Sequence, residues 1–415
     1  MKKQLLVYIS ALVFIVAACA KKNEEPQPVT SVPDGDGYDI VSIVPANGKV
    51  GDEVVITTNQ IQDVARVTIH GLRASISTIE NEKITVTIPQ YATSGKVKLE
   101  VRDKALEAES KDDFVVEYPA NQLAFVGGDT RYGASGFAIG TKIYMGLGFR
   151  GQDDFWEYDT QTNAWKQLAN FPGGKRGFAV SFVIDGKGYM GTGRLYNTSA
   201  NTSTWYKDFW QYDPATDQWT KKADFAGSAR TEAVGFAING KGYIGTGLDE
   251  RGNQNDMWEY NPTIDRWTQM ADLTDDNFFG LSRKQAVCFV INNKAYIGTG
   301  NTDRKDFWEF TPTATDQWRK VADFGGVGRG SALAFTISGK GYVGTGYTES
   351  GYKNDMWQYD PATDQWTKKT DFSGGQRIWA IGFAIGNKAY IGTGWGLNNY
   401  TSSYSPMRDF WQYTP

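Results

Sequence analysis

Short runs in which apolar and polar residues alternate make up most of this chain. The runs "VVITT" at 54–58, "ARVTIH" at 65–70, "KITVTI" at 83–88 and "KVKLEV" at 96–101 have the period of two that is typical of half-buried strands. Glycine, proline and asparagine separate the runs, as expected of turns. The pattern predicts a small antiparallel β-sandwich over residues 38–118.

From residue 119 to the end, the chain repeats one pattern six times. Each copy contains Arg, then Phe six positions later, then Tyr-x-Gly-x-Gly, a loop of variable length, and Asp-x-Trp-x-aromatic. Successive arginines are 45, 54, 53, 46 and 48 residues apart. A period near ~50 residues with four strands in each copy predicts a six-bladed β-propeller over residues 119–415. The fold class is therefore predicted to be all-β.

The sixth copy stops at "DFWQYTP", residues 409–415, before its fourth strand. Five fourth strands are present, and they begin at Trp165, Trp219, Trp267, Trp318 and Trp366. The segment "NQLAFVGGDTR" at 121–131 stands before Arg131 as "KQLANFPGGKR" stands before Arg176. We therefore predict that the N-terminal segment supplies the outer strand of blade 6 and closes the ring, which removes exposed sheet edges.

Residues 1–18 have the pattern of a signal peptide. Lys2 and Lys3 precede an apolar run that is too short to cross a membrane as a mature helix. The run ends in "VAAC", which resembles the lipobox of bacterial lipoproteins, and this resemblance implies lipidation of Cys19. Residues 19–37 are polar and rich in proline and glycine, so we predict a flexible tether.

The "KKNEE" at 21–25 resembles a short charged tag that directs some lipoproteins to the outer surface. We expect an outer membrane lipoprotein that is exposed at the cell surface, with a periplasm-facing orientation as the alternative. The membrane is then a partner through the lipid anchor only.

Two regions resemble known families. Pro45, Gly48, Gly51 and the later segment "VTIPQYATSGKVKLEV" resemble the IPT/TIG immunoglobulin-like module, which implies a spacer or a contact surface. The six copies resemble the Kelch repeat of galactose-oxidase-like propellers. The Gly-Gly of that family is here Gly-Thr-Gly, or Gly-Leu-Gly at 146–148.

Composition and rare residues exclude several functions. The chain has 43 Lys+Arg against 47 Asp+Glu, a mildly acidic balance that argues against nucleic acid as a partner. The single histidine, His70, precedes the repeats, so a Ser–His–Asp triad or a histidine metal site in the propeller is excluded. The copper chemistry of galactose oxidase therefore does not carry over, and we expect no cofactor and no metal. If Cys19 carries lipid, Cys288 has no disulfide partner and reads as a small core residue.

The repeated charges are predicted to lie on one rim of the propeller, because strand one begins where strand three begins. Two interpretations remain open: each Arg pairs with the Asp of its own blade as scaffold, or the arginines surround a mouth for an anion. The arginines are Arg131, Arg176, Arg230, Arg283, Arg329 and Arg377, and the acids are Asp154, Asp208, Asp256, Asp306, Asp355 and Asp409.

Function is sought where the copies differ. Two positions after each Arg, and before a recurrent Ala, stand Gly133, Phe178, Glu232, Gln285, Ser331 and Trp379, which we expect to face the mouth. The loops between strands two and three hold 5, 14, 8, 5, 8 and 14 residues in blade order. Two long loops thus flank blade 1, and we predict a sugar-binding cleft there, lined by Gly133, Phe178, Trp379, Trp205 and Trp395.

The sequence favours a non-catalytic protein that binds a glycan or another surface protein, as a monomer or as part of an envelope complex. Some Kelch propellers are sialic-acid mutarotases, and this resemblance implies the alternative of a sugar isomerase. In that case Glu232 and Arg230 are the candidate catalytic residues. A purely structural or adhesive envelope component is the third possibility.

Overall fold

The computed structural model describes residues 29–30, 39–59, 64–89, 92, 94–102, 107–117, 121–274, 281–398 and 403–415. The predicted signal peptide, Cys19 and most of the predicted tether lie outside the described residues. Within those residues, no helix is long and apolar enough to cross a membrane. Two compact units are present, one built mainly from residues before 116 and the other mainly from Val116–Pro415.

The N-terminal unit is an antiparallel β structure, as the alternation predicted. Its strands run in the order β1-β2-β4-β7-β6-β5-β8-β9, and β3 pairs separately with β10. Every second residue of β4 and β7 is buried, so one face of each strand supplies the core. The bounds are β1 Val29–Thr30, β2 Ile40–Val44, β3 Asn47–Lys49, β4 Glu53–Thr58, β5 Val64–Ile69, β6 Leu72–Glu80, β7 Lys83–Thr87, β8 Val97–Val101, β9 Glu107–Glu109 and β10 Val115–Glu117.

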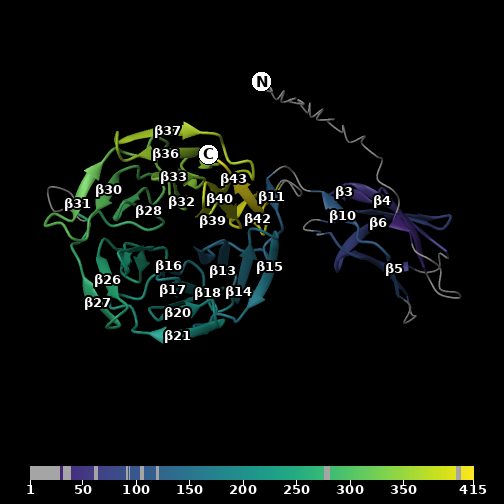
Figure 1. Cartoon of the computed structure of the whole chain (residues 1–415), viewed down its shortest axis with the longest axis horizontal. Coiled ribbons are helices and arrows are strands. Elements are labelled where there is room, and N and C mark those ends of the chain that lie inside the picture. Colours follow the sequence, from purple (N-terminus) through teal and green to yellow (C-terminus); the bar gives the residue numbers. More distant parts are fainter. Residues whose placement is uncertain are drawn as a thin grey trace, which may run out of the picture. The chain divides into compact units, whose positions relative to one another are not determined.

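The C-terminal unit is a ring of blades, each a four-stranded antiparallel sheet (Figure 1). Blade 1 is β12 Ser135–Ile139, β13 Lys142–Gly148, β14 Gln152–Asp159 and β15 Ala164–Leu168. Blade 2 is β16 Val180–Ile184, β17 Lys187–Gly191, β20 Phe209–Asp213 and β21 Gln218–Lys222. Blade 3 is β22 Val234–Ile238, β23 Lys241–Gly245, β26 Met257–Asn261 and β27 Arg266–Gln269.

The remaining blades have the same strand order. Blade 4 is β28 Val287–Ile291, β29 Lys294–Gly298, β30 Phe307–Phe310 and β31 Trp318–Val321. Blade 5 is β32 Leu333–Ile337, β33 Lys340–Gly344, β36 Met356–Asp360 and β37 Gln365–Lys369. Blade 6 is β39 Ile381–Ile385, β40 Lys388–Gly392, β43 Phe410–Tyr413 and β11 Gln122–Leu123.

Blade 6 is therefore assembled from both ends of the propeller segment. Gln122 lies opposite Trp411 and Leu123 lies opposite Phe410 in the antiparallel register of β11 and β43. Beyond β11, the Val126 N–H donates to the carbonyl of Arg408 at 2.8 Å. This pairing gives the last sheet its outer strand and joins the first and last blades.

Neighbouring blades pack through aromatic residues and small gaps left by glycine. A β-carbon at Gly188 of blade 2 would lie 1.9 Å from Cζ of Phe137 in blade 1. Trp219, in the outer strand of blade 2, packs edge-on against Phe155 of blade 1 at 5.0 Å between ring centroids. Its indole N–H donates to the carbonyl of Ala169 at 3.2 Å. The recurrent Trp and Phe residues thus stabilise the scaffold.

Extra strands rise from the loops between the second and third strands, except that one strand of the blade 6 sheet precedes the first strand of that blade. They form hairpins in blades 2, 3 and 5, and a three-stranded sheet in blade 6. These elements are β18 Arg194–Asn197 with β19 Thr202–Trp205, β24 Leu248–Asp249 with β25 Gly252–Asn253, β34 Tyr347–Thr348 with β35 Gly351–Tyr352, and β38 Arg377–Ile378 with β41 Trp395–Asn398 and β42 Ser403–Pro406. They stand around the rim where the variable residues lie.

Candidate functional site

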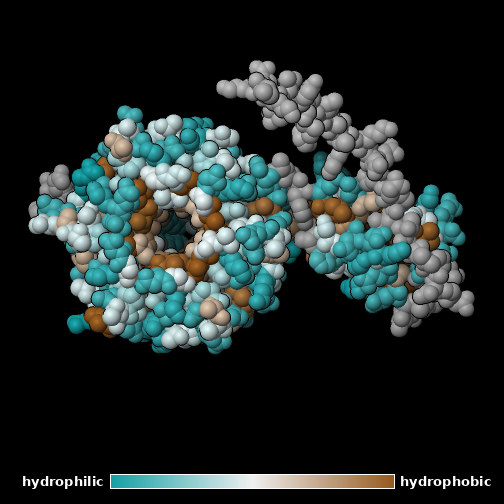
Figure 2. Space-filling model, in the orientation of Figure 1, coloured by the Kyte–Doolittle hydropathy of each residue, from teal (hydrophilic) through white to brown (hydrophobic). Residues whose placement is uncertain are grey.

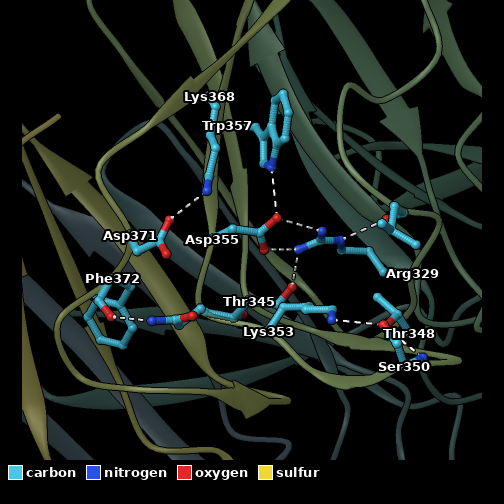
Figure 3. A network of polar contacts seen from close by, with 12 residues as sticks. Arg329, Thr345, Thr348, Ser350, Lys353, Asp355, Trp357, Lys368, Asp371 and Phe372 are labelled. Carbon is cyan, nitrogen blue, oxygen red and sulfur yellow. Dashed lines mark hydrogen bonds and ion pairs between the residues drawn. The ribbon is translucent and has the colours of Figure 1, made fainter.

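The six repeat arginines are buried ion-pair partners, and none of their side chains is exposed. In blade 5, the Arg329 guanidinium donates to both carboxylate oxygens of Asp355, at 2.5 and 2.8 Å, and to the carbonyl of Thr345 at 2.8 Å (Figure 3). The indole N–H of Trp357 donates to the same carboxylate at 2.8 Å. The Asp-x-Trp motif therefore holds Arg within its own blade, which is the geometry of the scaffold interpretation.

The six variable residues form a ring around the propeller axis. The main-chain N–H of each residue donates to the carbonyl of the equivalent residue in the preceding blade. The Phe178 N–H donates to Gly133 at 2.8 Å, and the Gly133 N–H closes the ring by donating to Trp379 at 3.3 Å. All six have left-handed φ angles between 54° and 62°, and they are Gly133, Phe178, Glu232, Gln285, Ser331 and Trp379. Such angles cost about 1 kcal/mol or more per non-glycine residue, and the hydrogen bonds between blades offset that cost.

These residues line a small cavity at the axis, together with the alanines that follow them. The volume of this axial cavity is about 160 Å³. Figure 2 shows that the propeller is hollowed at its centre and that hydrophobic residues gather around the opening in that view. The variable position thus faces a cavity.

A second, larger cavity adjoins the axial one and shares Gln285, Ser331 and Trp379 with it. Its volume is about 560 Å³, and we call it the side cavity. The remaining lining residues come from blades 3 to 6 and are Asn253, Lys284, Asn301, Thr302, Tyr347, Tyr352 and Ile378. Only the larger volume falls within the 300–1,000 Å³ typical of small-molecule sites.

The cleft predicted over blade 1 is filled by aromatic side chains. Tyr132 stacks on Trp379 at 5.3 Å and meets Trp395 edge-on at 5.5 Å between ring centroids. Phe178 packs against Trp379 at 5.4 Å and against Phe149 at 5.3 Å. The prediction overlooked Tyr132 and Phe149, which pack against each other and against Phe178, while Phe178 itself occupies the space that the small Gly133 leaves.

Trp205 does not join the other predicted residues either. Its ring lies against the Arg194 guanidinium at 5.2 Å, and it lines a separate groove between the hairpins of blades 2 and 3. The side cavity instead lies over blade 4, the other blade with a five-residue loop. Loop length alone does not distinguish blades 1 and 4, because both have five residues between the second-strand Gly and the third-strand Asp.

Glu232 is the acidic residue of the axial cavity, and one of its carboxylate oxygens, Oε2, is buried without a hydrogen-bond partner among the described residues. Burial raises the pKa of its carboxyl group, while a hydrogen bond from Gln285 and the positive charges of Lys284 and Arg194 act in the opposite direction. The raised pKa suits a group that exchanges protons with a ligand. The indole nitrogen of Trp379 is a second buried polar atom without a described partner at this cavity.

Arg230, the other candidate catalytic residue, is engaged in hydrogen bonds within its own blade. Its guanidinium donates to both carboxylate oxygens of Asp256, to the carbonyl of Thr246 and to the hydroxyl of Ser228. These bonds occupy the guanidinium inside blade 3. Lys284 and Arg194 are the cations beside Glu232, and the repeat pattern concealed them because both lie outside the recurrent positions.

Among the described residues, no group of three or more His, Cys, Asp or Glu side chains is arranged to hold a metal ion. Cys288 lies on β28, where its thiol is 3.6 Å from the carbonyl oxygen of Gly235. Burial raises the pKa of this thiol to about 12, so it stays protonated at neutral pH.

Comparison with known proteins agrees with both units. A model of the IPT/TIG domain matches residues 39–118. The solved structure of YjhT is similar with a TM-score of 0.59 and 19% identity, over 69% of this chain and 95% of that one. At this identity the likeness shows the fold. The chain therefore carries an IPT/TIG domain followed by a propeller of the Kelch type.

Curated relatives share a shorter segment. The N-acetylneuraminate epimerase of Pasteurella multocida (strain Pm70) is 33% identical over 109 residues, 26% of this chain and 28% of that protein. The N-acetylneuraminate epimerase of Escherichia coli (strain K12) is 36% identical over 110 residues, 26% and 29% of the two chains. The matched segment thus spans less than a third of the length of these relatives.

Proposed function

We propose that this protein binds an acidic sugar of the N-acetylneuraminate class at the axial cavity and interconverts its anomers. The observation that carries the proposal is the pair of buried, unpartnered polar atoms at this cavity, Glu232 Oε2 and Trp379 Nε1. Leaving a buried polar atom unpaired costs about 1–3 kcal/mol, and a ligand in the cavity that pairs with these two atoms would recover that cost. The names of the partial relatives indicate the class of sugar.

Anomer exchange needs a proton donor and a proton acceptor at one carbon. The ring oxygen and the anomeric hydroxyl are both bonded to that carbon, so a single carboxyl group can reach both. Protonated Glu232 would give its proton to the ring oxygen while its other oxygen takes the hydroxyl proton, and the ring C–O bond breaks. Rotation of the open-chain ketone and reversal of the same steps give the other anomer with no net change in protons.

The charges around Glu232 fit an anionic sugar. In a 2-keto sugar acid the carboxylate is attached to the anomeric carbon itself, so a cation must stand beside the acid–base group. Lys284 and Arg194 both act on Glu232 electrostatically, and Lys284 also lines the side cavity. We propose that the sugar carboxylate lies toward these two side chains.

Binding of a glycan without turnover is the second candidate for the same site. The aromatic and amide side chains of the side cavity favour it, because sugar rings combine apolar faces with hydroxyl groups. Anomer exchange requires the Glu232 carboxyl group to transfer protons, whereas binding alone does not, so a substitution of Glu232 distinguishes the two candidates.

The test is exchange-resolved NMR of N-acetylneuraminic acid with the wild-type protein and Glu232→Gln. We expect the wild type to accelerate exchange between the anomers and the variant to lose about 100-fold or more of that acceleration. Glu250→Gln, an exposed acid on the turn of the same blade, is the matched control and should keep full activity. Saturable binding without any acceleration by the wild type would favour the non-catalytic candidate.

A further inference from the structure

We infer that the side cavity continues as a sugar-binding groove toward the outer edge of blades 5 and 6. The ligand it fits is an oligosaccharide whose reducing-end acidic sugar reaches Glu232. The identity of the end sugar rests on the proposed function. The new element is a groove for further linked sugars, which a site for a single sugar does not need.

The first observation is a series of aromatic side chains that leads away from the axis. Trp379 and Tyr352 both line the side cavity, as does Tyr347. Tyr352 meets Tyr347 edge-on at 5.6 Å and Tyr404 at 4.9 Å between ring centroids. Tyr347 and Tyr352 lie on the blade 5 hairpin and Tyr404 lies on the three-stranded sheet of blade 6, so these contacts lead from the side cavity to blade 6.

The second observation is that two tyrosines of this series are exposed. Tyr347 is 38% exposed and Tyr404 is 51% exposed. Exposed apolar side chains that form a contiguous series, unlike ones scattered singly, mark an interaction site. Tyrosine also suits sugars, because its ring stacks on the apolar face of a pyranose while its hydroxyl bonds to the sugar hydroxyls.

Polar groups on the opposite wall complete the groove. The Asn253 amide donates to the Asn301 side-chain oxygen at 3.1 Å, which fixes the two amides across blades 3 and 4. Asn301 also accepts from the main-chain N–H of Lys284 at 3.3 Å. Both amides line the side cavity together with Lys284, and amides that are already fixed lose little entropy when they bind sugar hydroxyls and N-acyl groups.

Volume supports a ligand longer than one sugar. The axial cavity of about 160 Å³ is too small for a whole substituted sugar, so the end sugar must extend into the side cavity. The side cavity is about 560 Å³, which leaves room beyond that sugar toward Tyr347. A linked second sugar would then lie over the exposed tyrosines.

The experiment measures affinity against chain length by calorimetry. The probes are N-acetylneuraminic acid and its linked dimer and tetramer, titrated into the wild-type protein, Tyr404→Ala and Tyr347→Ala. We expect the tetramer to bind the wild type about 3- to 10-fold more tightly than the monomer, and each substitution to remove most of that gain. Tyr404→Ala should leave monomer affinity unchanged, because Tyr404 does not line the side cavity.

Tyr196→Ala on the blade 2 hairpin is the matched control, because it removes a rim tyrosine that lines neither the axial nor the side cavity. It should leave the chain-length gain intact. Equal affinity for monomer and tetramer, or a gain that survives both groove substitutions, would overturn the groove. A gain without anomer exchange would retain the groove and reject the proposed catalysis, whereas no binding of any probe would reject both.

Discussion

The ring of Phe178 lies directly against Gly133, so that a β-carbon at position 133 would be 2.5 Å from its Cε1. The two residues occupy equivalent positions in neighbouring blades and are joined by a main-chain hydrogen bond of 2.8 Å. The space that glycine leaves over blade 1 is therefore used by its neighbour's ring. The side cavity is lined instead by residues of blades 3 to 6.

Gly133→Ala is expected to destabilise the propeller by about 2–4 kcal/mol, from the left-handed backbone and from displacement of Phe178. Gly240→Ala is the matched control, because Gly240 has a similar φ of 73° but nothing within 4 Å of its added β-carbon. Urea unfolding of both variants separates the two contributions. Equal losses would show that Phe178 moves aside without cost.

Arg329→Ala is expected to lower the free energy of unfolding by about 3–5 kcal/mol, because it leaves the Asp355 carboxylate without its buried partner. Lys368→Ala removes an exposed pair, with 3.5 Å between Lys368 and Asp371, and should cost less than about 1 kcal/mol. Thermal and urea unfolding check both values. Weaker sugar binding by Arg329→Ala at unchanged stability would instead support the anion-mouth interpretation.

Because the pKa of Glu232 is raised, we expect Glu232→Gln to stabilise the folded protein by an amount that depends on pH. Between the unfolded pKa and the higher folded pKa, the folded state binds more protons, so the wild-type free energy of unfolding falls as pH rises. Glutamine has no such loss. The variant should therefore melt at a higher temperature than wild type at pH 8, and the difference should vanish below about pH 4. A gain that is equal at both pH values would contradict this cause.

Deletion of residues 121–128 removes β11 and is expected to leave blade 6 with an unpaired edge. The edge of β43 would then be free to pair with other chains, so we expect a lower melting temperature and soluble aggregates. Light scattering and thermal unfolding measure the two effects. A monomeric variant with unchanged melting would show that β11 is dispensable for closure.

Cys19→Ser tests the proposed lipid anchor, which rests on the "VAAC" pattern alone. We expect the substitution to abolish acylation and to move the protein from the membrane fraction to the soluble fraction. Metabolic labelling with a fatty acid and fractionation of cells measure both outcomes. A variant that remains in membranes would contradict anchoring through this residue.

The scaffold of this protein was readable from its sequence because repetition makes local rules visible. Phe182 and Tyr189 have counterparts at the same positions of every copy, and in blade 2 both belong to the buried core. The early end of the last copy likewise pointed to an outer strand from the N-terminal side. The mouth positions, such as Glu232 and Gln285, could be identified because they vary beside constant neighbours.

The location of the open site was decided by tertiary structure. Blades 1 and 4 have equally short loops, but Tyr132 and Phe149 pack against each other over blade 1, whereas residues of blade 4 line the side cavity. The burial that raises the pKa of Glu232, and its proximity to Lys284, also depend on contacts between blades. Such contacts join residues about 50 positions apart in the chain, and the shape of a cavity depends on all the side chains around it at once.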